Sequence, residues 1–291
     1  MKRILIISDG KPGHLNQSIA FCKIKNISYD IVEVKFKTKL HKAMSYFFDR
    51  INHYTDELFE DYRKYYYEFY DAVVSTGSST YYFNKFISKT QNKKSVVLML
   101  PKGYKYVNFD YIIAQEHDKA PKLDNILEVP LNLSYSKAKN ILEKNEEKNA
   151  VGIIIGGNNS VFTLDVDDLR DELNKIFEES TNSLKYITTS ARTPFEVDGL
   201  IDEYEFDYKL IYSREPEINP VYDFINVCDE LYITQDSTSM LSEARANTDA
   251  KINIINLKSK KENTKYHRLV EKVSSMNKKV DFEKLLERVE I

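Results

Sequence analysis

Short apolar runs alternate with amphipathic stretches along most of this chain, and the alternation predicts parallel β-sheets covered by helices. The first apolar run, 3–7, is followed by a polar loop and by a helical stretch at about 15–25. A second apolar run then completes a β-loop-α-β unit, from which a parallel sheet can grow. The strands predicted in the first half cover 3–7, 29–34, 71–75, 96–100, 111–114 and 126–129.

Residues 39–70 follow a different pattern, because apolar and aromatic side chains recur there at helical spacing with charges between them. This periodicity predicts one long helix or two shorter ones. The apolar and aromatic side chains between 44 and 70 can be interpreted as ordinary core packing. They can also be interpreted as an aromatic face that meets a lipid-linked or membrane-bound acceptor.

The second half of the chain repeats the alternation after a charged stretch at 134–149, which we expect to be mostly helical. That stretch is too polar to build a large core, so it marks a domain boundary. We expect two parallel-sheet lobes with a cleft between them, at 1–138 and 149–280, and a closing helix at 281–291. The strands predicted in the second lobe cover 151–155, 186–189, 208–211, 230–234 and 251–257, and its helices cover 167–180, 219–227, 241–246 and 266–270.

Composition indicates a soluble protein of two domains, since 291 residues allow about two domains of ordinary size. The net charge of −3, from 42 basic and 45 acidic residues, argues against a protein that mainly coats nucleic acid. No apolar run approaches the roughly 20 residues of a membrane span, and the first run is too short for a signal peptide. We therefore expect a cytoplasmic protein. Cys22 and Cys228 lie far apart and support neither a disulfide framework nor a cysteine metal site.

The strongest candidate for ligand chemistry is the loop that follows the predicted strand 230–234. Asp236, Ser237, Thr238 and Ser239 stand at the start of a helix, where free backbone amides and the positive dipole end attract anions. A diphosphate fits such a place, and Glu243 lies where a carboxylate could accept hydrogen bonds from ribose. The alternative is simple N-capping by Ser or Asp, with Glu243 on the helix surface.

Two further loops of the second lobe could contact the same ligand. Gly156 and Gly157 follow a buried strand and let the backbone approach a ligand closely. Arg192 follows another strand, between Ser190 and Thr193, and its guanidinium could fork onto a phosphate or carboxylate. It could equally be a structural surface arginine.

The first lobe offers candidate proton acceptors. Asp9 and His14 lie in a glycine-bracketed loop, where either could deprotonate a sugar hydroxyl and Lys11 could bind an anionic acceptor or phosphate. His117, between Glu116 and Asp118, is a further candidate base after a strand. The chain has no G-x-G-x-x-G fingerprint after its first strand, no P-loop and no G-x-S-x-G elbow. These absences argue against a standard dehydrogenase, an NTPase and an α/β-hydrolase.

Taken in order, these loops resemble the "elongated mitochondria" fission-protein family, whose bacterial members are described as glycosyltransferases and sometimes as nucleoside-diphosphate-sugar epimerases. The resemblance spans about residues 1–250. It implies a GT-B-like fold of two Rossmann-like lobes, with the donor nucleotide held mainly by the second and the last helix crossing back to the first. Ala191 stands where the family often has a second arginine, so Arg192 alone must serve. The resemblance is carried by Ser8–His14 with Asn16 and Gln17, by Glu116–Asp118, by Gly156 and Gly157 followed by Phe162, by Thr189–Pro194 and by Thr234–Ala244.

The function expected on this basis is a metal-independent glycosyltransferase that takes a nucleotide sugar as substrate and needs no cofactor. Its acceptor would be a cell-envelope glycan or a lipid-linked molecule, reached at the inner face of the membrane, and nucleic acid is not an expected partner. The alternatives are a sugar-nucleotide epimerase that uses Glu116, His117 and Asp118, and a non-catalytic protein whose partner surface is 44–70. The expected donor site is Gly156, Gly157, Ser190, Arg192, Thr193, Asp236, Ser237, Thr238, Ser239 and Glu243; the catalytic candidates are Asp9, His14 and His117; and the acceptor loop has Gly10, Lys11, Gly13 and Gln17.

Overall fold

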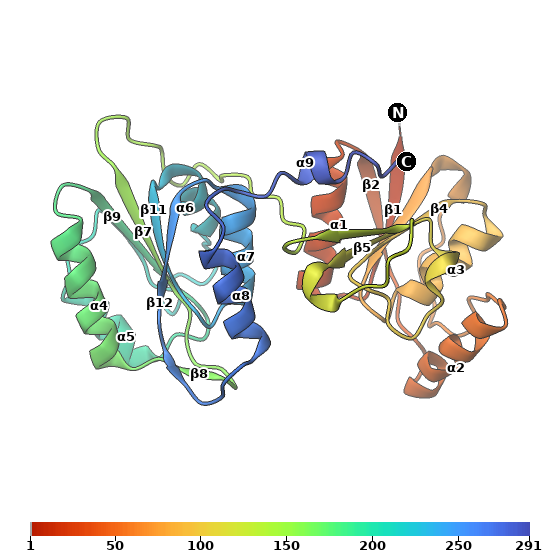
Figure 1. Ribbon diagram of the computed structural model, residues 1–291, viewed down its shortest axis with the longest axis horizontal. Helices are drawn as coiled ribbons and strands as arrows, with labels where there is room; N and C mark the ends of the chain where they lie inside the picture. Colours follow the sequence, from red (N-terminus) through yellow and green to blue (C-terminus); the bar gives the residue numbers. More distant parts are fainter. Residues whose placement is uncertain (1) are drawn as a thin grey trace. The chain divides into compact units, whose positions relative to one another are not determined.

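The computed structural model describes residues 2–291, except for the side chain of Lys265, and the chain divides into two compact units (Figure 1). Unit 1 is the chain up to Tyr135 together with Asp281–Ile291, and unit 2 is Ser136–Val280. Each unit has its own parallel sheet, which confirms the two-lobed α/β fold predicted from the apolar runs.

Unit 1 is built on a six-stranded sheet in the order β2-β1-β3-β4-β5-β6, and every neighbouring pair is parallel. The central strands are buried along nearly their whole length, as expected for a parallel sheet covered by helices. The strands are β1 (Arg3–Ser8), β2 (Ser28–Glu33), β3 (Ala72–Thr76), β4 (Lys94–Leu98), β5 (Tyr111–Gln115) and β6 (Ile126–Val129). The helices are α1 (Pro12–Ile24), α2 (Lys39–Arg50), α3 (Tyr81–Thr90) and α9 (Phe282–Leu285), with short 3₁₀ turns η1 (Tyr67–Phe69), η2 (Tyr106–Asn108) and η3 (Glu116–Asp118).

The helical pattern predicted over 39–70 is correct only for its first part. Helix α2 ends at Arg50, and Asn52 adopts a φ of 55°, the left-handed conformation that commonly follows a helix. Most of the aromatic residues beyond it pack onto the core without an α-helix, whereas Tyr66 and Phe69 are exposed. Phe59, for example, stacks on Phe36 with ring centroids 4.3 Å apart. The periodic spacing beyond Arg50 therefore does not correspond to a second α-helix.

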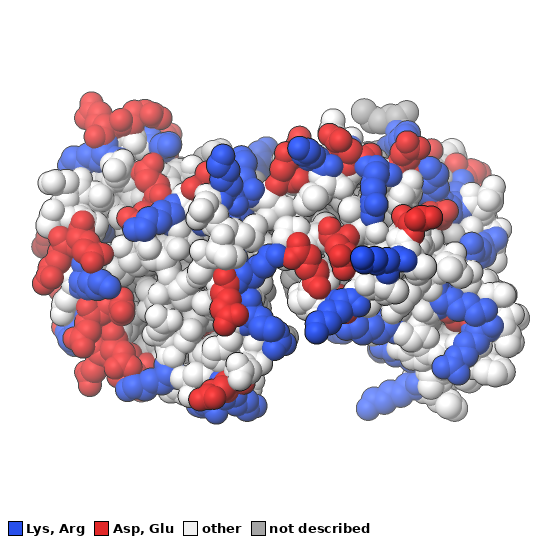
Figure 2. Space-filling model, in the orientation of Figure 1, with Lys and Arg blue, Asp and Glu red and all other residues white. Residues whose placement is uncertain are grey.

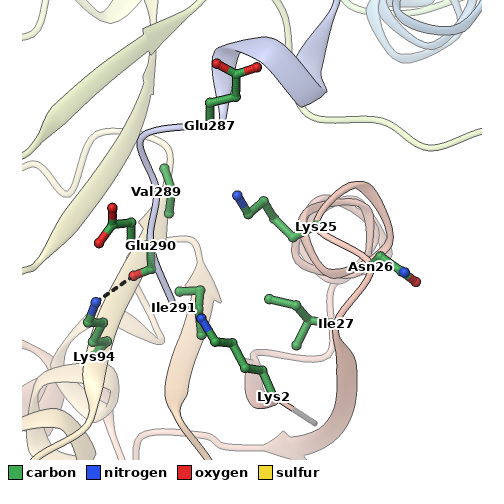
Figure 3. Close-up of a pocket in the computed structure, with 9 residues that line it drawn as sticks. All are labelled: Lys2, Lys25, Asn26, Ile27, Lys94, Glu287, Val289, Glu290 and Ile291. Carbon is green, nitrogen blue, oxygen red and sulfur yellow. Dashed lines mark hydrogen bonds between the residues drawn. The ribbon is translucent and has the colours of Figure 1, made fainter.

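The closing helix expected at 281–291 is wrong for most of its length, because only Phe282–Leu285 is helical. The rest of this tail is held by side chains of unit 1. Lys25 Nζ donates to the Leu286 carbonyl at 3.1 Å, and Lys94 Nζ donates to the Glu290 carbonyl at 2.8 Å (Figure 3). The pocket in Figure 3 is lined by Lys2, Ile27 and Lys94, which stand just before or at the start of β1, β2 and β4. It therefore lies at the amino ends of the strands, away from the carboxyl ends where α/β proteins bind ligands.

Unit 2 contains a five-stranded parallel sheet in the order β10-β9-β7-β11-β12 and a short antiparallel pair, β8 with β13. One of its helices, α5, was not predicted. The strands are β7 (Ala150–Ile155), β8 (Phe162–Thr163), β9 (Leu184–Thr189), β10 (Tyr208–Leu210), β11 (Glu230–Thr234), β12 (Lys251–Ile255) and β13 (Lys258–Ser259). The helices are α4 (Val166–Glu179), α5 (Phe195–Asp202), α6 (Val221–Val227), α7 (Thr238–Asn247) and α8 (Lys265–Ser274).

The charged stretch 134–149 contains no helix, which corrects the sequence prediction. Its backbone is tied instead to the buried side chain of Asp223. The amides of Lys139 and Ile141 donate to the two carboxylate oxygens of Asp223, at 3.2 and 3.0 Å. Because those amides bond a carboxylate, they cannot donate within a helix here.

No helix among the described residues is long and apolar enough to cross a membrane.

Candidate functional site

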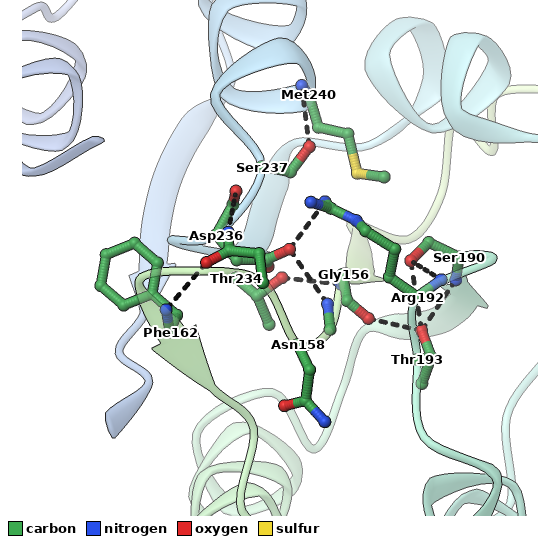
Figure 4. A network of polar contacts seen from close by, with 12 residues as sticks. Gly156, Asn158, Phe162, Ser190, Arg192, Thr193, Thr234, Asp236, Ser237 and Met240 are labelled. Carbon is green, nitrogen blue, oxygen red and sulfur yellow. Dashed lines mark hydrogen bonds and ion pairs between the residues drawn. The ribbon is translucent and has the colours of Figure 1, made fainter. Parts of the chain in front are cut away.

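The carboxyl ends of three neighbouring strands bring the predicted donor loops of unit 2 together. Strands β9, β7 and β11 are adjacent and parallel, so the loops that follow them leave the sheet at the same edge. Figure 4 shows Gly156, Arg192 and Asp236 meeting at this edge, each from a different loop. We call this group of loops the strand-end site of unit 2.

The buried carboxylate of Asp236 lies at the centre of this site. Its Oδ2 accepts a hydrogen bond from Arg192 Nη2 at 2.7 Å and another from the Gly157 amide at 3.0 Å (Figure 4). The Asp236 side chain has no exposed surface, and burial raises the pKa of its carboxyl. Asp236, which we expected to contact the ligand, therefore joins the loops after β9 and β7.

The glycines at 156 and 157 are required by packing within the protein. A Cβ on Gly156 would lie 2.1 Å from Asp236 Oδ1. A Cβ on Gly157 would lie 1.9 Å from the Arg192 carbonyl oxygen. The loops after β9 and β11 therefore approach these two glycines closely, and this packing holds the three strand ends in one arrangement.

Arg192 remains available to an anion despite its ion pair, because 42% of its side chain is exposed. Its loop is held in shape by its neighbours. Thr193 Oγ1 donates to the Gly156 carbonyl and accepts from the Ser190 amide at 2.9 Å. The Arg192 amide in turn donates to Ser190 Oγ at 3.3 Å. Ser190 and Thr193 thus position the loop, and the guanidinium presents its remaining N–H groups.

Helix α7 begins beside these loops. Ser237 Oγ caps it by accepting from the Met240 amide at 3.3 Å, so its hydroxyl has the capping role that was the alternative to ligand binding. Thr238 is half-buried and Ser239 is exposed. The amides at the start of a helix have no partner within it, and they give this edge a positive partial charge.

Glu243 has a protein partner that the sequence analysis missed. Burial is the main cause that raises the pKa of Tyr222 to about 12, and a hydrogen bond and the charge of Glu243 contribute. Glu243 is half-buried on α7, and Tyr222 comes from α6. A ribose contact by this carboxylate would therefore be shared with a tyrosine hydroxyl.

Unit 1 has a second strand-end site, formed by the loops after the adjacent strands β1 and β3. The Asp9 carboxylate, whose side chain is only 5% exposed, has both oxygens 3.1 Å from His14 Nδ1. A carboxylate can only accept, so Nδ1 carries the proton and a neutral ring keeps a lone pair on Nε2. Lys11 Nζ lies 3.3 Å from the same carboxylate. The predicted residues Asp9, Lys11 and His14 therefore lie in contact with one another.

The loop after β3 supplies residues that the sequence analysis did not assign to a site. Gly77 has a φ of +93°, and a Cβ there would lie 2.3 Å from His14 Nδ1, so the imidazole rests on this glycine. Lys42, on α2, donates to Ser78 Oγ at 2.8 Å and to Ser79 Oγ at 3.2 Å. Burial, followed by repulsion from Lys11, lowers the pKa of Lys42. The strand-loop-helix pattern around Gly77 was visible in the sequence, but nothing in it connected Lys42 to that loop.

The remaining predicted residues of unit 1 are less closely joined. His117 is exposed on η3, and β4 separates its strand from β3. Gly10 has a φ of +75° beside Glu33, while Gly13 has open space around its α-carbon. Gln17 donates to the Gly13 carbonyl at 3.2 Å. His117 is thus a weaker catalytic candidate than His14.

No group of three or more His, Cys, Asp or Glu among the described residues could hold a metal ion.

The chain matches the family model of mitochondrial fission ELM1 over residues 12–290. No curated protein matches it. Among solved structures, it is similar to a protein described as a UDP-N-acetylglucosamine 2-epimerase from Listeria monocytogenes, at 13% identity and a TM-score of 0.51. That likeness covers 93% of this chain and 82% of the other. It shows a shared fold of two Rossmann-like units, the GT-B-like fold expected from the sequence.

Two further solved structures are similar to this chain with TM-scores below 0.5. MnaA from S. aureus, solved with UDP, is 12% identical with a TM-score of 0.45, covering 87% of this chain and 78% of the other. The glycosyltransferase SnogD from Streptomyces nogalater is 10% identical with a TM-score of 0.44, covering 99% of both chains.

Proposed function

The chain belongs to the mitochondrial fission ELM1 family, and from this premise we propose that it is a glycosyltransferase that binds a nucleotide sugar at the strand-end site of unit 2. The observation that carries the proposal is the pairing of Arg192 with Asp236 beside the start of α7. The loop after β9 contributes a cation held by Asp236, and the start of α7 contributes backbone amides that have no partner within the helix. Together they suit a diphosphate.

The chemistry follows from the charge that develops when the glycosidic bond of the donor breaks. Negative charge then grows on the leaving diphosphate, and preorganised donors lower the barrier by stabilising it. Arg192, the first amides of α7 and the hydroxyls of Thr238 and Ser239 are the groups we assign to this task. Because Asp236 already orients the guanidinium, little reorganisation is needed as the charge appears.

The strand-end site of unit 1 would supply the base. With its Nδ1 proton directed at Asp9, His14 can accept a proton at Nε2 from an acceptor hydroxyl. Lys11 and Lys42 place positive charge nearby, which suits an acceptor that carries phosphate. We propose that the acceptor is a glycan or a lipid-linked molecule of this kind.

The test is a binding screen of the whole chain against UDP-, GDP-, dTDP- and CMP-sugars. A ligand at 100 times its dissociation constant should raise the free energy of unfolding by about 2.7 kcal/mol, which a thermal shift detects. Arg192→Ala removes a charged hydrogen bond worth about 1.5–3 kcal/mol, so we expect affinity to fall roughly 10- to 100-fold. Arg214→Ala, which removes an exposed pair with Asp202 elsewhere in unit 2, is the matched control.

The outcomes separate the candidate functions. Release of the nucleotide (a nucleoside diphosphate, or CMP from a CMP-sugar) that depends on an added acceptor supports a transferase. Conversion of the bound nucleotide sugar without any acceptor would identify an epimerase instead. If none of the nucleotide sugars binds, the proposal is wrong, and a non-catalytic role becomes the better explanation.

A further inference from the structure

Helix α2 exposes a stripe of large apolar side chains. Leu40, Phe47 and Ile51 are 68%, 59% and 56% exposed. Leu40 and Phe47 are separated by seven residues and Phe47 and Ile51 by four, spacings that put all three on one face of a helix. Single exposed apolar residues are ordinary, but a row of three, with Leu40 and Phe47 on α2 and Ile51 at its C-cap, marks an interaction surface. We call Leu40, Phe47 and Ile51 the outer stripe of α2.

The opposite face of α2 is firmly attached to unit 1, so the direction of the outer stripe is fixed. Ser45 Oγ lies 2.8 Å from Tyr104 Oη, and both side chains are buried. Asp49 forms a buried ion pair with Lys85 at 2.5 Å and accepts from the Lys105 amide at 2.7 Å. These bonds leave the outer stripe facing away from the core.

The exposed charged side chains of α2 are all positive. Lys39 and Arg50, which are exposed, lie on one flank of it, and Lys37 just before the helix is also exposed. The single acid of α2 is Asp49, whose carboxylate is buried against Lys85. Figure 2 shows Lys and Arg side chains over α2, whereas acidic side chains gather over α4.

We propose that α2 lies on the surface of an anionic lipid bilayer. Leu40, Phe47 and Ile51 would enter the boundary between head groups and acyl chains, as the apolar face of an interfacial helix does. Lys39 and Arg50 would contact lipid phosphates and so add an electrostatic attraction to an anionic surface. An anionic bilayer binds such a helix by burying its apolar side chains and by attracting the cations beside them.

Charge argues against a second copy of this chain as the occupant. A two-fold dimer through α2 would bring the same surface of each copy together. Lys39 and Arg50 of one copy would then face the same cations of the other, with no exposed acid on either helix to compensate. A bilayer with anionic lipids has the opposite charge.

The same helix reaches the strand-end site of unit 1. Lys42, on the side of α2 away from the outer stripe, donates to Ser78 and Ser79 beside the Asp9–His14 pair. A helix docked on a bilayer would therefore hold that site within reach of lipid head groups. This last step rests on the proposed function and specifies its acceptor as a phosphate-bearing lipid.

The test is flotation of the full chain with vesicles of phosphatidylcholine alone and of phosphatidylcholine mixed with phosphatidylglycerol. We expect binding to the mixed vesicles that weakens as salt is added, and little binding to the neutral ones. The double variant Phe47→Ser with Ile51→Ser should lower the partition coefficient at least about tenfold. The double variant Lys39→Glu with Arg50→Glu should abolish the preference for anionic vesicles.

Phe195→Ser is the matched control, since Phe195 is 79% exposed but stands beside Glu196 on α5 of unit 2. It should bind vesicles like the wild type. Equal loss in this control, or no binding of the wild type to anionic vesicles, would overturn the proposal. A dimer in solution that the Phe47→Ser, Ile51→Ser variant disrupts would assign the stripe to a second copy instead. Nucleotide-sugar binding, measured on the same variants, should be unchanged, so failure of this proposal is distinguishable from failure of the proposed function.

Discussion

The carboxylate of Asp236 holds the guanidinium of Arg192 at 2.7 Å and so joins the loops that follow two different strands of unit 2. The two partners differ in exposure, since the Asp236 side chain is fully buried while 42% of Arg192 is exposed. The pair therefore has an inner end that fixes the fold and an outer end that can meet a ligand. This asymmetry leads to a prediction in which stability and binding change together.

Asp236→Asn keeps the shape of the side chain but removes its charge. We expect the free energy of unfolding to fall by about 1–3 kcal/mol, because a charged hydrogen bond is weakened inside the protein. Nucleotide-sugar affinity should fall about tenfold, since Arg192 loses its orientation. Urea unfolding and calorimetric titration measure the two effects. Asp202→Asn, which breaks the exposed pair with Arg214, should change stability by less than about 1 kcal/mol. Equal effects of the two substitutions would contradict a special role for Asp236.

Gly157→Ala tests the requirement for glycine in the loop after β7. The new Cβ would meet a backbone carbonyl only 1.9 Å away, so the Arg192 loop must shift, and we expect a loss of about 1–3 kcal/mol or more. Gly199→Ala is the control, because nothing lies within 4 Å of its Cβ position in α5. There the substitution should stabilise by up to about 1 kcal/mol. Thermal unfolding of both variants gives the comparison, and a harmless Gly157→Ala would show that this loop is not tightly packed.

The Asp9–His14 pair predicts a loss of turnover without a loss of donor binding. His14→Gln removes the proposed base and should lower kcat by about 10²- to 10⁴-fold. Asp9→Asn should act similarly, since an amide can favour the wrong tautomer of the ring. His41→Gln, at a histidine that contacts Thr38 near the start of α2, is the control and should keep its activity. Steady-state kinetics with the donor found in the binding screen would check this, and an unchanged kcat in His14→Gln would exclude it as the base.

The strand-end loops were predictable from the sequence because parallel strands bring their carboxyl ends to one edge. Arg192, Asp236 and Gly157 were recognised in this way as neighbours. The sequence did not predict which of these residues is buried and which is exposed, and burial decides what each residue can contact. The sequence did not show that Asp236 would accept hydrogen bonds from Arg192 and from the amide of Gly157. A loop sequence shows which groups are present, while only packing shows which of them face inward.

The sequence analysis predicted too much helix in stretches where only the spacing of apolar and charged residues supported it. The periodicity of 39–70 continues past Asn52, but this residue turns the chain out of the helix with a positive φ. The stretch before β7 fails for another reason, because Asp223 binds its amides from a helix more than 80 residues further along. The same lack of long-range information hid Lys42, which reaches Ser78 and Ser79 from a helix whose sequence shows no link to them.

The buried Lys85 predicts a dependence of stability on pH. Burial lowers the pKa of Lys85 to about 8, from an ordinary value of 10.5, even though Asp49 lies beside it. Between these two values the unfolded chain binds more protons than the folded one, so the free energy of unfolding rises with pH. Measurements should stop near pH 9, because above it the raised pKa of the buried Cys22 thiol, about 12, acts in the opposite direction.

The comparison is between the wild type and a double variant, Asp49→Asn with Lys85→Met, unfolded by urea at several pH values from about 7.5 to 9. Replacing both partners avoids leaving an unpaired buried charge, which would itself cost several kcal/mol. The side-chain carbonyl that Asp49→Asn leaves in place can still accept from the Lys105 amide, so α2 should keep its position. We expect the wild type to gain stability over this range relative to the variant. If the two chains show the same slope, Lys85 is not the group that titrates, and its ammonium must remain charged in the folded protein throughout the range.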